Sequence, residues 1–218
     1  MNLKENFIKL YIYKYYIIIL VLFFITIIFN FDNCRRSIIK VPILKNIIYK
    51  LSQNRNEWIH NKISHLLPDP PATIMNLGCG LNVYSEYLEK LKYNVLAVDV
   101  NDVSVTKNEI IIYDGKNLPT CNYDVCILST VLHHIPQEDH PRIMKMIGKC
   151  CKKLIVIEDD NDYFLTSTIC MITNIQFYNH PMAFRNYNGW LIFFEKYCNI
   201  LSSYTDKKQC VFHLEFKC

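Results

Sequence analysis

The sequence predicts an α/β fold: a seven-stranded, mostly parallel sheet with helices on both faces and an antiparallel pair at one edge. Three observations predict it. From residue 72 onward, short apolar runs alternate with stretches of helical periodicity, as in strand–helix–strand units. The runs are almost wholly apolar, as expected of strands covered on both faces. The last two runs, 199–205 and 210–218, are close in sequence, which favours an antiparallel pair.

The elements follow in order along the chain. Apolar residues at helical spacing predict one or two helices within 38–67, and the PDPP stretch at 68–71 ends them. Five strands are expected to form the parallel part of the sheet, at 72–77, 94–100, 109–114, 123–129 and 153–159. Helices are expected at 83–92, 137–150 and 190–197.

The N-terminal part of the chain has a different composition. Residues 15–29 read YYIIILVLFFITIIF, in which Thr26 is the one polar member. With its apolar flanks this run approaches the roughly 20 residues of a membrane-spanning helix. No small-residue cleavage site follows it, which favours an uncleaved anchor over a signal peptide. We therefore expect a transmembrane anchor over 1–32, a helical linker or cap over 33–70, and the main domain over 71–218.

The charges around this run indicate an orientation. More cations follow the run than precede it: Arg35, Arg36, Lys40, Lys45 and Lys50 against Lys4, Lys9 and Lys14. This excess predicts a single-pass membrane protein whose main domain faces the cytosol. The 10 cysteines are then expected to be reduced thiols.

Composition limits the other partners. The net charge of +4 is mild and no basic stripe is interleaved with aromatic residues, so no nucleic acid is expected. No obligate protein partner is indicated. Zinc is an alternative use of some side chains, but their spacing is irregular and no CxxC pair is present, so we expect no metal. The candidate ligands of this zinc alternative are Cys121, Cys126, His133, His134 and His140.

The stretch NLGCGLN, residues 76–82, carries two of the 5 glycines in the chain. Glycine allows a tight turn and the close approach of a ligand to the backbone. In a parallel sheet, ligands bind beyond the carboxyl ends of the strands. Asp99, Asp114 and Ser129 also follow strand ends, so we expect them to converge with the glycines. Asp99 follows Gly80 by 19 residues, near the spacing of a carboxylate that binds ribose hydroxyls; a helix cap or turn is its alternative role.

The motifs NLGCGLN, LAVDV, IIYDGKNLP, YDVCILSTVLHHIP and LIVIED occur in the same order as in the class I S-adenosylmethionine-dependent methyltransferases, which the chain resembles over roughly residues 72–160. The resemblance implies a Rossmann-like fold, transferase activity and S-adenosyl-L-methionine as cofactor. In that family the glycine loop passes the methionine part, the acid after the second strand holds the ribose, and the acid after the third lies near the adenine. The cofactor-binding residues so implied are Asn76, Gly78, Cys79, Gly80, Asp99, Val100, Asp114, Gly115 and Ser129.

The resemblance also points to an acceptor site. His133 and His134 match a paired element of small-molecule methyltransferases, in some of which the first histidine is the general base. His133 is therefore the candidate base, with capping a helix or packing against the cofactor as its alternative roles. His134, Glu158 and Arg185 are candidate substrate residues. For Glu158 we prefer the other interpretation, a helix cap that faces water. The aromatic stretch around Arg185, residues 178–190, suits either a substrate cover or core packing.

The sequence departs from the family pattern at two positions. Asn76 stands where an acid is usual and Asn82 where a small residue is usual. The predicted function is methyl transfer to a small-molecule, lipid or membrane-associated acceptor. One alternative is a membrane-tethered binding module without activity, which Asn76 favours. The other is an NAD-dependent oxidoreductase, but Val83 replaces the third glycine of GxGxxG.

Overall fold

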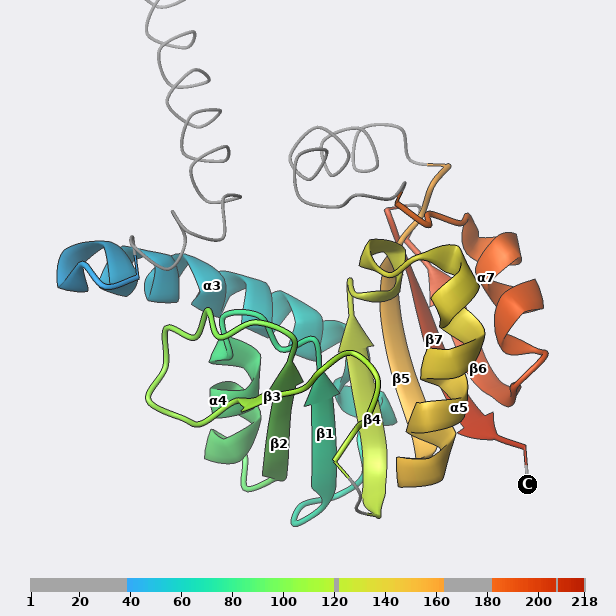
Figure 1. Ribbon diagram of the computed structural model, residues 1–218, viewed down its shortest axis with the longest axis horizontal. Helices are drawn as coiled ribbons and strands as arrows, with labels where there is room; N and C mark the ends of the chain where they lie inside the picture. The colour runs from blue at the N-terminus through green and yellow to red at the C-terminus, as the bar shows by residue number, and fades with distance from the viewer. Residues whose placement is uncertain (1–38, 120–121, 163–181, 207, 218) are drawn as a thin grey trace, which may run out of the picture.

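A computed structural model of the chain describes residues 39–119, 122–162, 182–206 and 208–217. Seven strands form one sheet in the order β3-β2-β1-β4-β5-β7-β6 (Figure 1). Strands β1 to β5 are parallel, and β7 runs antiparallel to both β5 and β6. The predicted α/β sheet with an antiparallel edge pair is confirmed. The strands are β1 (Thr73–Leu77), β2 (Asn94–Asp99), β3 (Ile111–Ile112), β4 (Tyr123–Ser129), β5 (Cys151–Asp159), β6 (Cys198–Thr205) and β7 (Gln209–Phe216).

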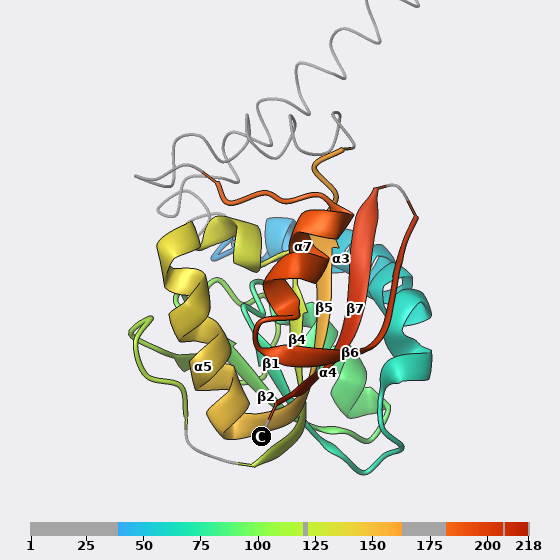
Figure 2. The same ribbon diagram turned by 90° about the vertical axis from the view of Figure 1, so that its right-hand side faces the viewer.

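Helices cover both faces of the sheet, as predicted. In Figure 2, α5 and α7 lie on one side of the strands and α3 and α4 on the other. The α-helices are α3 (Pro42–Ile63), α4 (Val83–Lys90), α5 (His140–Cys150) and α7 (Tyr187–Phe194); short 3₁₀ turns are η1 (Ser64–Leu66), η2 (Leu132–His134) and η3 (Gln137–Asp139).

Two hydrophobic layers hold the helices to the sheet. Successive strand residues point to opposite faces, and both faces are buried, so Ile74 and Met75 are each 0% exposed. Ile74 packs in the layer under α3 and α4, and Met75 in the layer under α5 and α7. This arrangement explains why the strand sequences are continuously apolar rather than alternating.

Two elements differ from their predicted bounds. Strand β3 has two residues instead of the six expected over 109–114, because it is an edge strand with one neighbour and Ile112 is 50% exposed. Helix α7 starts three residues earlier than expected. The Asn186 side chain caps it by accepting a hydrogen bond from Gly189 N at 2.9 Å.

Helix α3 joins the predicted linker to the domain. It is a single helix that ends before Pro68, and Ile59 and Ile63 are buried in the same layer as Tyr84 and Leu88 of α4. The predicted membrane anchor lies outside the described residues. Within the described part of the chain, no helix is both long enough and apolar enough to span a bilayer.

Candidate active site

The order of strands changes direction between β1 and β4, which are neighbours in the sheet. Such a switch point is where open α/β sheets bind ligands. Gly78 follows β1 there with φ +76°, and a Cβ on it would lie 2.5 Å from Val131 Cγ2, in the segment after β4. Glycine is therefore required at position 78 by both backbone conformation and space. This contact brings the glycine loop against the segment that carries His133.

The glycine loop is also held to the end of β2. The amide of Gly80 donates to Asp99 Oδ2 at 2.7 Å, and the amide of Asn101 donates to Oδ1 at 3.0 Å. A Cβ on Gly80 would meet no described atom within 4 Å, so this side of the loop is open. Each Asp99 oxygen keeps a second lone pair for a hydroxyl donor. Burial, followed by the nearby Asp99 charge, raises the pKa of the Cys79 thiol.

The two asparagines that depart from the family pattern have structural partners. Asn76 is buried and its Nδ2 donates to Ser85 Oγ of α4 at 2.8 Å. Asn82 adopts φ +62° and its Nδ2 donates to the carbonyl of Asn108 at 3.2 Å. Asn76 thus joins β1 to α4, and Asn82 provides the left-handed residue that begins α4.

The residues after β3 form a tight exposed turn. Asp114 Oδ1 accepts from the amides of Lys116 and Asn117 at 2.7 and 2.8 Å. These backbone hydrogen bonds, Asn117 first, lower the pKa of the Asp114 carboxyl. Gly115 has φ +74° and its carbonyl accepts from Arg142 of α5 at 2.5 Å. Val100, after β2, is 51% exposed.

At the end of β4 the chain turns sharply. Thr130 has φ +57°, and its amide donates to the carbonyl of Ile157 in β5 at 2.7 Å. Its hydroxyl accepts from Arg55 of α3 at 2.7 Å. The preceding Ser129 Oγ is buried and has no hydrogen-bond partner among the described residues. Such an unsatisfied group at a strand end is a candidate ligand contact.

His133 and Glu158 form a buried pair next to this turn. His133 is 1% and Glu158 0% exposed, and His133 Nδ1 lies 2.5 Å from Glu158 Oε2. The prediction that Glu158 faces water is therefore wrong. Glu158 Oε1 accepts from the amides of Val131 and Leu132 at 2.9 and 2.7 Å. A carboxylate that accepts two amides can only accept from His133 as well, so Nδ1 donates. The proton-accepting nitrogen of neutral His133 is then Nε2.

Aromatic rings flank the His133 imidazole. Phe184 stacks on it with ring centroids 4.8 Å apart and planes inclined by 15°. The ring centroid of the next residue, His134, lies 4.1 Å from that of His133. The main chain reinforces the contact, since the amide of Ala183 donates to the carbonyl of His133 at 2.9 Å. The stretch predicted as a substrate cover or core packing therefore contributes a wall against His133.

Arg185 lies behind the His133 turn. Its guanidinium donates to His140 Nδ1 at 2.9 Å and lies 4.7 Å from the Trp190 ring centroid. His140 Nε2 in turn donates to the carbonyls of Leu132 and Ile135 at 2.9 and 3.0 Å. Burial, and then the Arg185 charge, lowers the pKa of His140. Arg185, predicted as a substrate residue, thus supports the 3₁₀ turn that carries His133.

Three residues that shape the site were not among the predicted site residues: Arg55, Phe184 and His140, the last of which supports the turn that carries His133. Arg55 had no local signal, because its partner Thr130 is 75 residues away in sequence. Phe184 belonged to a recognised aromatic stretch without an assigned role. His140 was considered only for zinc, and among the described residues no group of three potential metal ligands comes together; Cys121 lies outside them.

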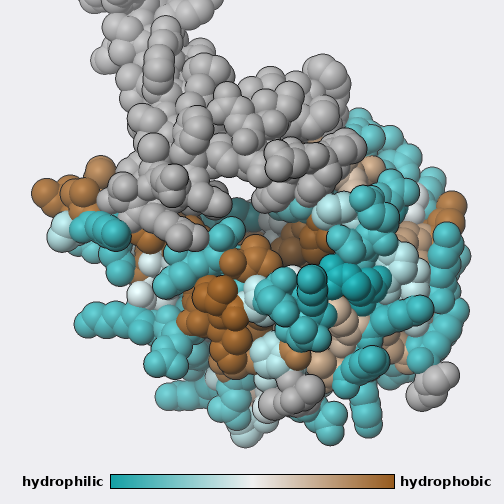
Figure 3. Space-filling model, in the orientation of Figure 1, coloured by the Kyte–Doolittle hydropathy of each residue, from teal (hydrophilic) through white to brown (hydrophobic). Residues whose placement is uncertain are grey.

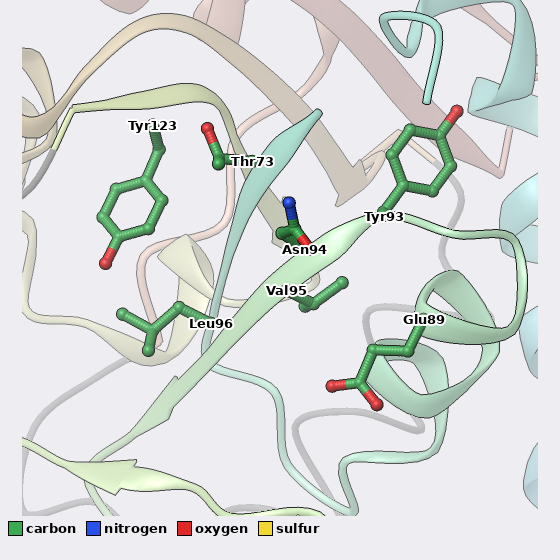
Figure 4. Close-up of a pocket in the computed structure, with 7 residues that line it drawn as sticks. All are labelled: Thr73, Glu89, Tyr93, Asn94, Val95, Leu96 and Tyr123. Atoms are coloured by element: carbon green, nitrogen blue, oxygen red, sulfur yellow. The ribbon is translucent and has the colours of Figure 1, made fainter. Parts of the chain in front are cut away.

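Two surface hollows lie apart from this site. One, of about 420 Å³, is lined by Thr73, Glu89, Tyr93, Asn94, Val95, Leu96 and Tyr123 (Figure 4). Thr73, Asn94 and Tyr123 begin β1, β2 and β4, so this hollow lies at the amino ends, opposite the switch point. The other, of about 550 Å³, lies between the loop after Gly115 and α5. Neither contains Asp99 or His133, and neither shows a convergent polar set.

Solved structures share the fold of this chain at low sequence identity. A protein from Pyrococcus horikoshii OT3 aligns with a TM-score of 0.63 at 14% identity, over 76% of this chain and 92% of that one. Magnesium protoporphyrin IX methyltransferase from Synechocystis PCC 6803, with bound SAH, gives 0.55 at 14%, over 76% and 83%. An O-methyltransferase of neocarzinostatin biosynthesis, in complex with S-adenosylmethionine and 2-hydroxy-5-methyl naphthoic acid, gives 0.60 at 9%, over 84% and 61%. The shared feature is a Rossmann-like methyltransferase fold.

The sequence assigns the family. A methyltransferase domain profile matches residues 51–206, well over half of the chain, and the chain belongs to that family. The match begins within α3, so it includes part of the segment predicted as a linker. No curated protein sequence matches the chain.

Proposed function

We propose that this protein is an S-adenosylmethionine-dependent methyltransferase that uses His133 as a general base toward a hydroxyl-bearing acceptor. The observation that carries the proposal is the buried His133–Glu158 pair, placed against the glycine loop through the contact of Gly78 with Val131. Membership of the methyltransferase family and the shared fold support it.

The residues at the switch point fit the cofactor. The open side of Gly80 admits a ligand against the backbone, Asp99 has acceptor capacity for ribose hydroxyls, and the buried Ser129 Oγ lacks a described partner. S-adenosylmethionine supplies a methyl group already activated by its sulfonium. Asn76 offers the cofactor no charge because a side-chain amide is neutral, and its Nδ2 already donates to Ser85. Val100, Asp114 and Gly115 would border the adenine end.

The chain's own contribution to the chemistry is orientation and proton removal. Glu158 fixes the tautomer and the plane of His133, since it accepts from Nδ1 while two backbone amides hold its other oxygen. Nε2 then accepts a proton from the acceptor hydroxyl, a step for which an imidazole is suited near neutral pH. Alignment of acceptor and methyl donor supplies much of the remaining rate. Phe184 would restrict the acceptor to planar or apolar groups near the hydroxyl.

The acceptor class follows from the whole chain. The apolar run at residues 15–29 supports a single-pass anchor, and the cations after it support a cytosolic position for the domain. A lipid or another membrane-associated molecule with a phenol or hydroxyl then becomes the preferred acceptor. A soluble small molecule of similar chemistry is the second choice.

The deciding experiment is calorimetric titration of the full chain in detergent with S-adenosylmethionine and with S-adenosylhomocysteine. We expect binding that Asp99→Ala abolishes and that Asp124→Ala retains. Asp124 is a matched control because it also accepts a backbone amide, from Thr73 at 2.7 Å, but at the amino end of the sheet.

A screen of hydroxylated lipids, quinols and phenols with methyl-labelled cofactor would follow. Binding without transfer to any of them would favour the alternative of a tethered module without activity. Absence of binding by the folded wild-type chain would refute the proposed function.

A further inference from the structure

We propose that the outer face of α3 lies on the surface of an anionic lipid bilayer and holds the carboxyl edge of the sheet toward the membrane. The inference rests on the proposed membrane anchoring of the methyltransferase and adds a second contact, made by described residues of the domain itself.

Helix α3 has a second apolar face besides the one that packs on the domain. Its buried residues, such as Ile59 at 4% and Ile63 at 0%, face α4 and the sheet. At 100° per residue, a separate exposed stripe within about 100° of the circumference is mainly apolar, with the exposed Asn54 as a polar member between Leu51 and Trp58. Its members are Ile43 (73% exposed), Leu44 (39%), Ile47 (49%), Leu51 (67%) and Trp58 (40%). Figure 3 shows apolar surface at the end of the molecule where α3 begins.

This stripe is unusual for a domain surface. Single exposed apolar side chains need no explanation, but an aligned set along four turns of one helix marks an interaction face. The stripe combines aliphatic residues with a tryptophan, the residue most typical of a membrane–water interface. At the C-terminal end of the stripe, Lys62 Nζ lies 4.2 Å from the Trp58 ring centroid and also pairs with Asp206 Oδ2 at 2.5 Å.

The charge of this part of the chain selects anionic lipid as the occupant. Between Asp32 and Glu57 the sequence carries six cations and no acid: Arg35, Arg36, Lys40, Lys45, Lys50 and Arg55. Within α3, Lys50 and Arg55 flank the stripe, each about 20° beyond its edge, whereas Lys45 lies on the side that faces the domain. A helix with an apolar face and a basic border lies in the interface of bilayers that contain anionic lipids. A second copy of the same surface would instead place these cations against one another.

The length of chain between the apolar run at 15–29 and α3 is short enough for α3 to lie on the same bilayer. Residues 30–41 separate the run from the first turn of α3. Fully extended, they span at most roughly 40 Å, which keeps α3 close to the bilayer when the run is inserted. A short tether raises the effective concentration of the stripe at the lipid surface, so weak contacts suffice.

The contact also orients the candidate active site. Arg55, one turn before Trp58, donates to the hydroxyl of Thr130 at the end of β4. In Figure 1, α3 crosses the molecule on the side to which the arrowheads of β1, β2 and β4 point. A bilayer under α3 therefore faces the edge that carries Asp99 and His133, and an acceptor could reach that edge without leaving the lipid surface.

Trp58 allows a direct test, because the chain has only 2 tryptophans and the other, Trp190, is 0% exposed. The full chain is reconstituted in vesicles of phosphatidylcholine and phosphatidylglycerol, with and without bromine on the acyl chains. We expect brominated lipid to reduce Trp58 emission about twofold, since an interfacial helix buries its apolar face roughly 5–10 Å into the headgroup and acyl boundary. Trp58→Phe should remove the quenched signal and leave that of Trp190.

A matched pair of variants tests the stripe. Ile43→Ser with Leu51→Ser should lose most of the quenching, whereas Ile192→Ser with Leu201→Ser, at 61% and 45% exposed positions of α7 and β6, should keep it. All four are surface positions, so thermal melts should stay within a few degrees of wild type.

Wild-type Trp58 that brominated lipid leaves unquenched would overturn the inference, as would quenching that the Ile43 and Leu51 changes leave intact. A blue shift that depends on protein density but not on bromine would assign the face to a second copy and would also overturn it. The readout needs neither cofactor nor acceptor, so its failure is separate from a failure to bind S-adenosylmethionine.

Discussion

Replacing Glu158 by glutamine should reverse the tautomer of His133 while the fold remains. In the wild type, Glu158 accepts three hydrogen bonds, from two backbone amides and from His133 Nδ1. The glutamine oxygen can still accept from the amides, but its NH₂ group then faces Nδ1. His133 must turn Nδ1 into an acceptor and carry its proton on Nε2, where it cannot take one from a substrate.

The magnitude follows from the bonds changed. Hydrogen bonds to a charged group contribute about 1.5–3 kcal/mol and neutral ones about 1, and relief of a buried charge offsets part of the loss. We expect a net cost of about 2 kcal/mol, or roughly 4–8 °C in Tm for a chain of this size. Loss of the base should lower kcat by about 10²–10⁴ with a small change in KM.

Nitrogen-15 NMR of the imidazole rings measures the tautomer without any acceptor. Asp159→Asn is the control, because Asp159 is also buried but accepts from Gln209 at 2.9 Å. The wild type and the Asp159 variant should show a protonated Nδ1, and Glu158→Gln a protonated Nε2. A protonated Nδ1 in all three, or full transfer activity in Glu158→Gln, would refute the role assigned to Glu158.

Three further outcomes are expected. Gly78→Ala would place a methyl group 2.5 Å from Val131 Cγ2 in a left-handed conformation, so urea titration should show a loss of roughly 2–5 kcal/mol and calorimetry no cofactor binding. Gly80→Ala, in open space, should lose about 1 kcal/mol in the same urea titration. The pKa of His140 is lowered by burial and then by the neighbouring guanidinium, so its contribution to stability is full above the unfolded-state pKa of about 6.5 and is lost as pH falls below it. His140→Gln should therefore flatten the fall in unfolding free energy below about pH 6.5, which is up to about 1.4 kcal/mol per pH unit for one proton. The backbone amide of Thr73, and then its hydroxyl, lower the pKa of Asp124. The contribution of Asp124 to stability is therefore present above the unfolded-state pKa of about 3.9 and is lost as pH falls through the lower folded value. Asp124→Asn should lower Tm at neutral pH and match wild type near pH 2.

The fold was predictable because its signals are local. Continuous apolar runs identified the strands, and their alternation with helical stretches identified a sheet covered on both faces. The cap at Asn186 was also a local signal, but the expected helix was placed on the apolar residues that follow it, so its predicted start was three residues too late. The extent of β3 was not predictable, since three consecutive isoleucines predict a strand whether or not a second neighbour exists to pair with it.

In the candidate site, too, local relations were predictable and contacts that depend on strand register were not. The sequence spacing connected Gly80 with Asp99, and the structure joins them by a hydrogen bond. The partner of His133 was not readable, because it depends on the register in which Ser129 of β4 lies opposite Ile157 of β5. That register brings Glu158 beside the turn after β4, and no pattern within either segment encodes it.

The position of β7 determines when the domain can assemble during synthesis. This strand lies between β5 and β6, and Asp159 pairs with Gln209 across about 50 residues of chain. Val211 of β7 shares a hydrophobic layer with Ile59 of α3, so the inner side of α3 is also incomplete until β7 is made. The apolar N-terminal run leaves the ribosome long before that point. In the proposed anchored form, membrane insertion of this run would precede folding, and the sheet would stay open until β7 is made.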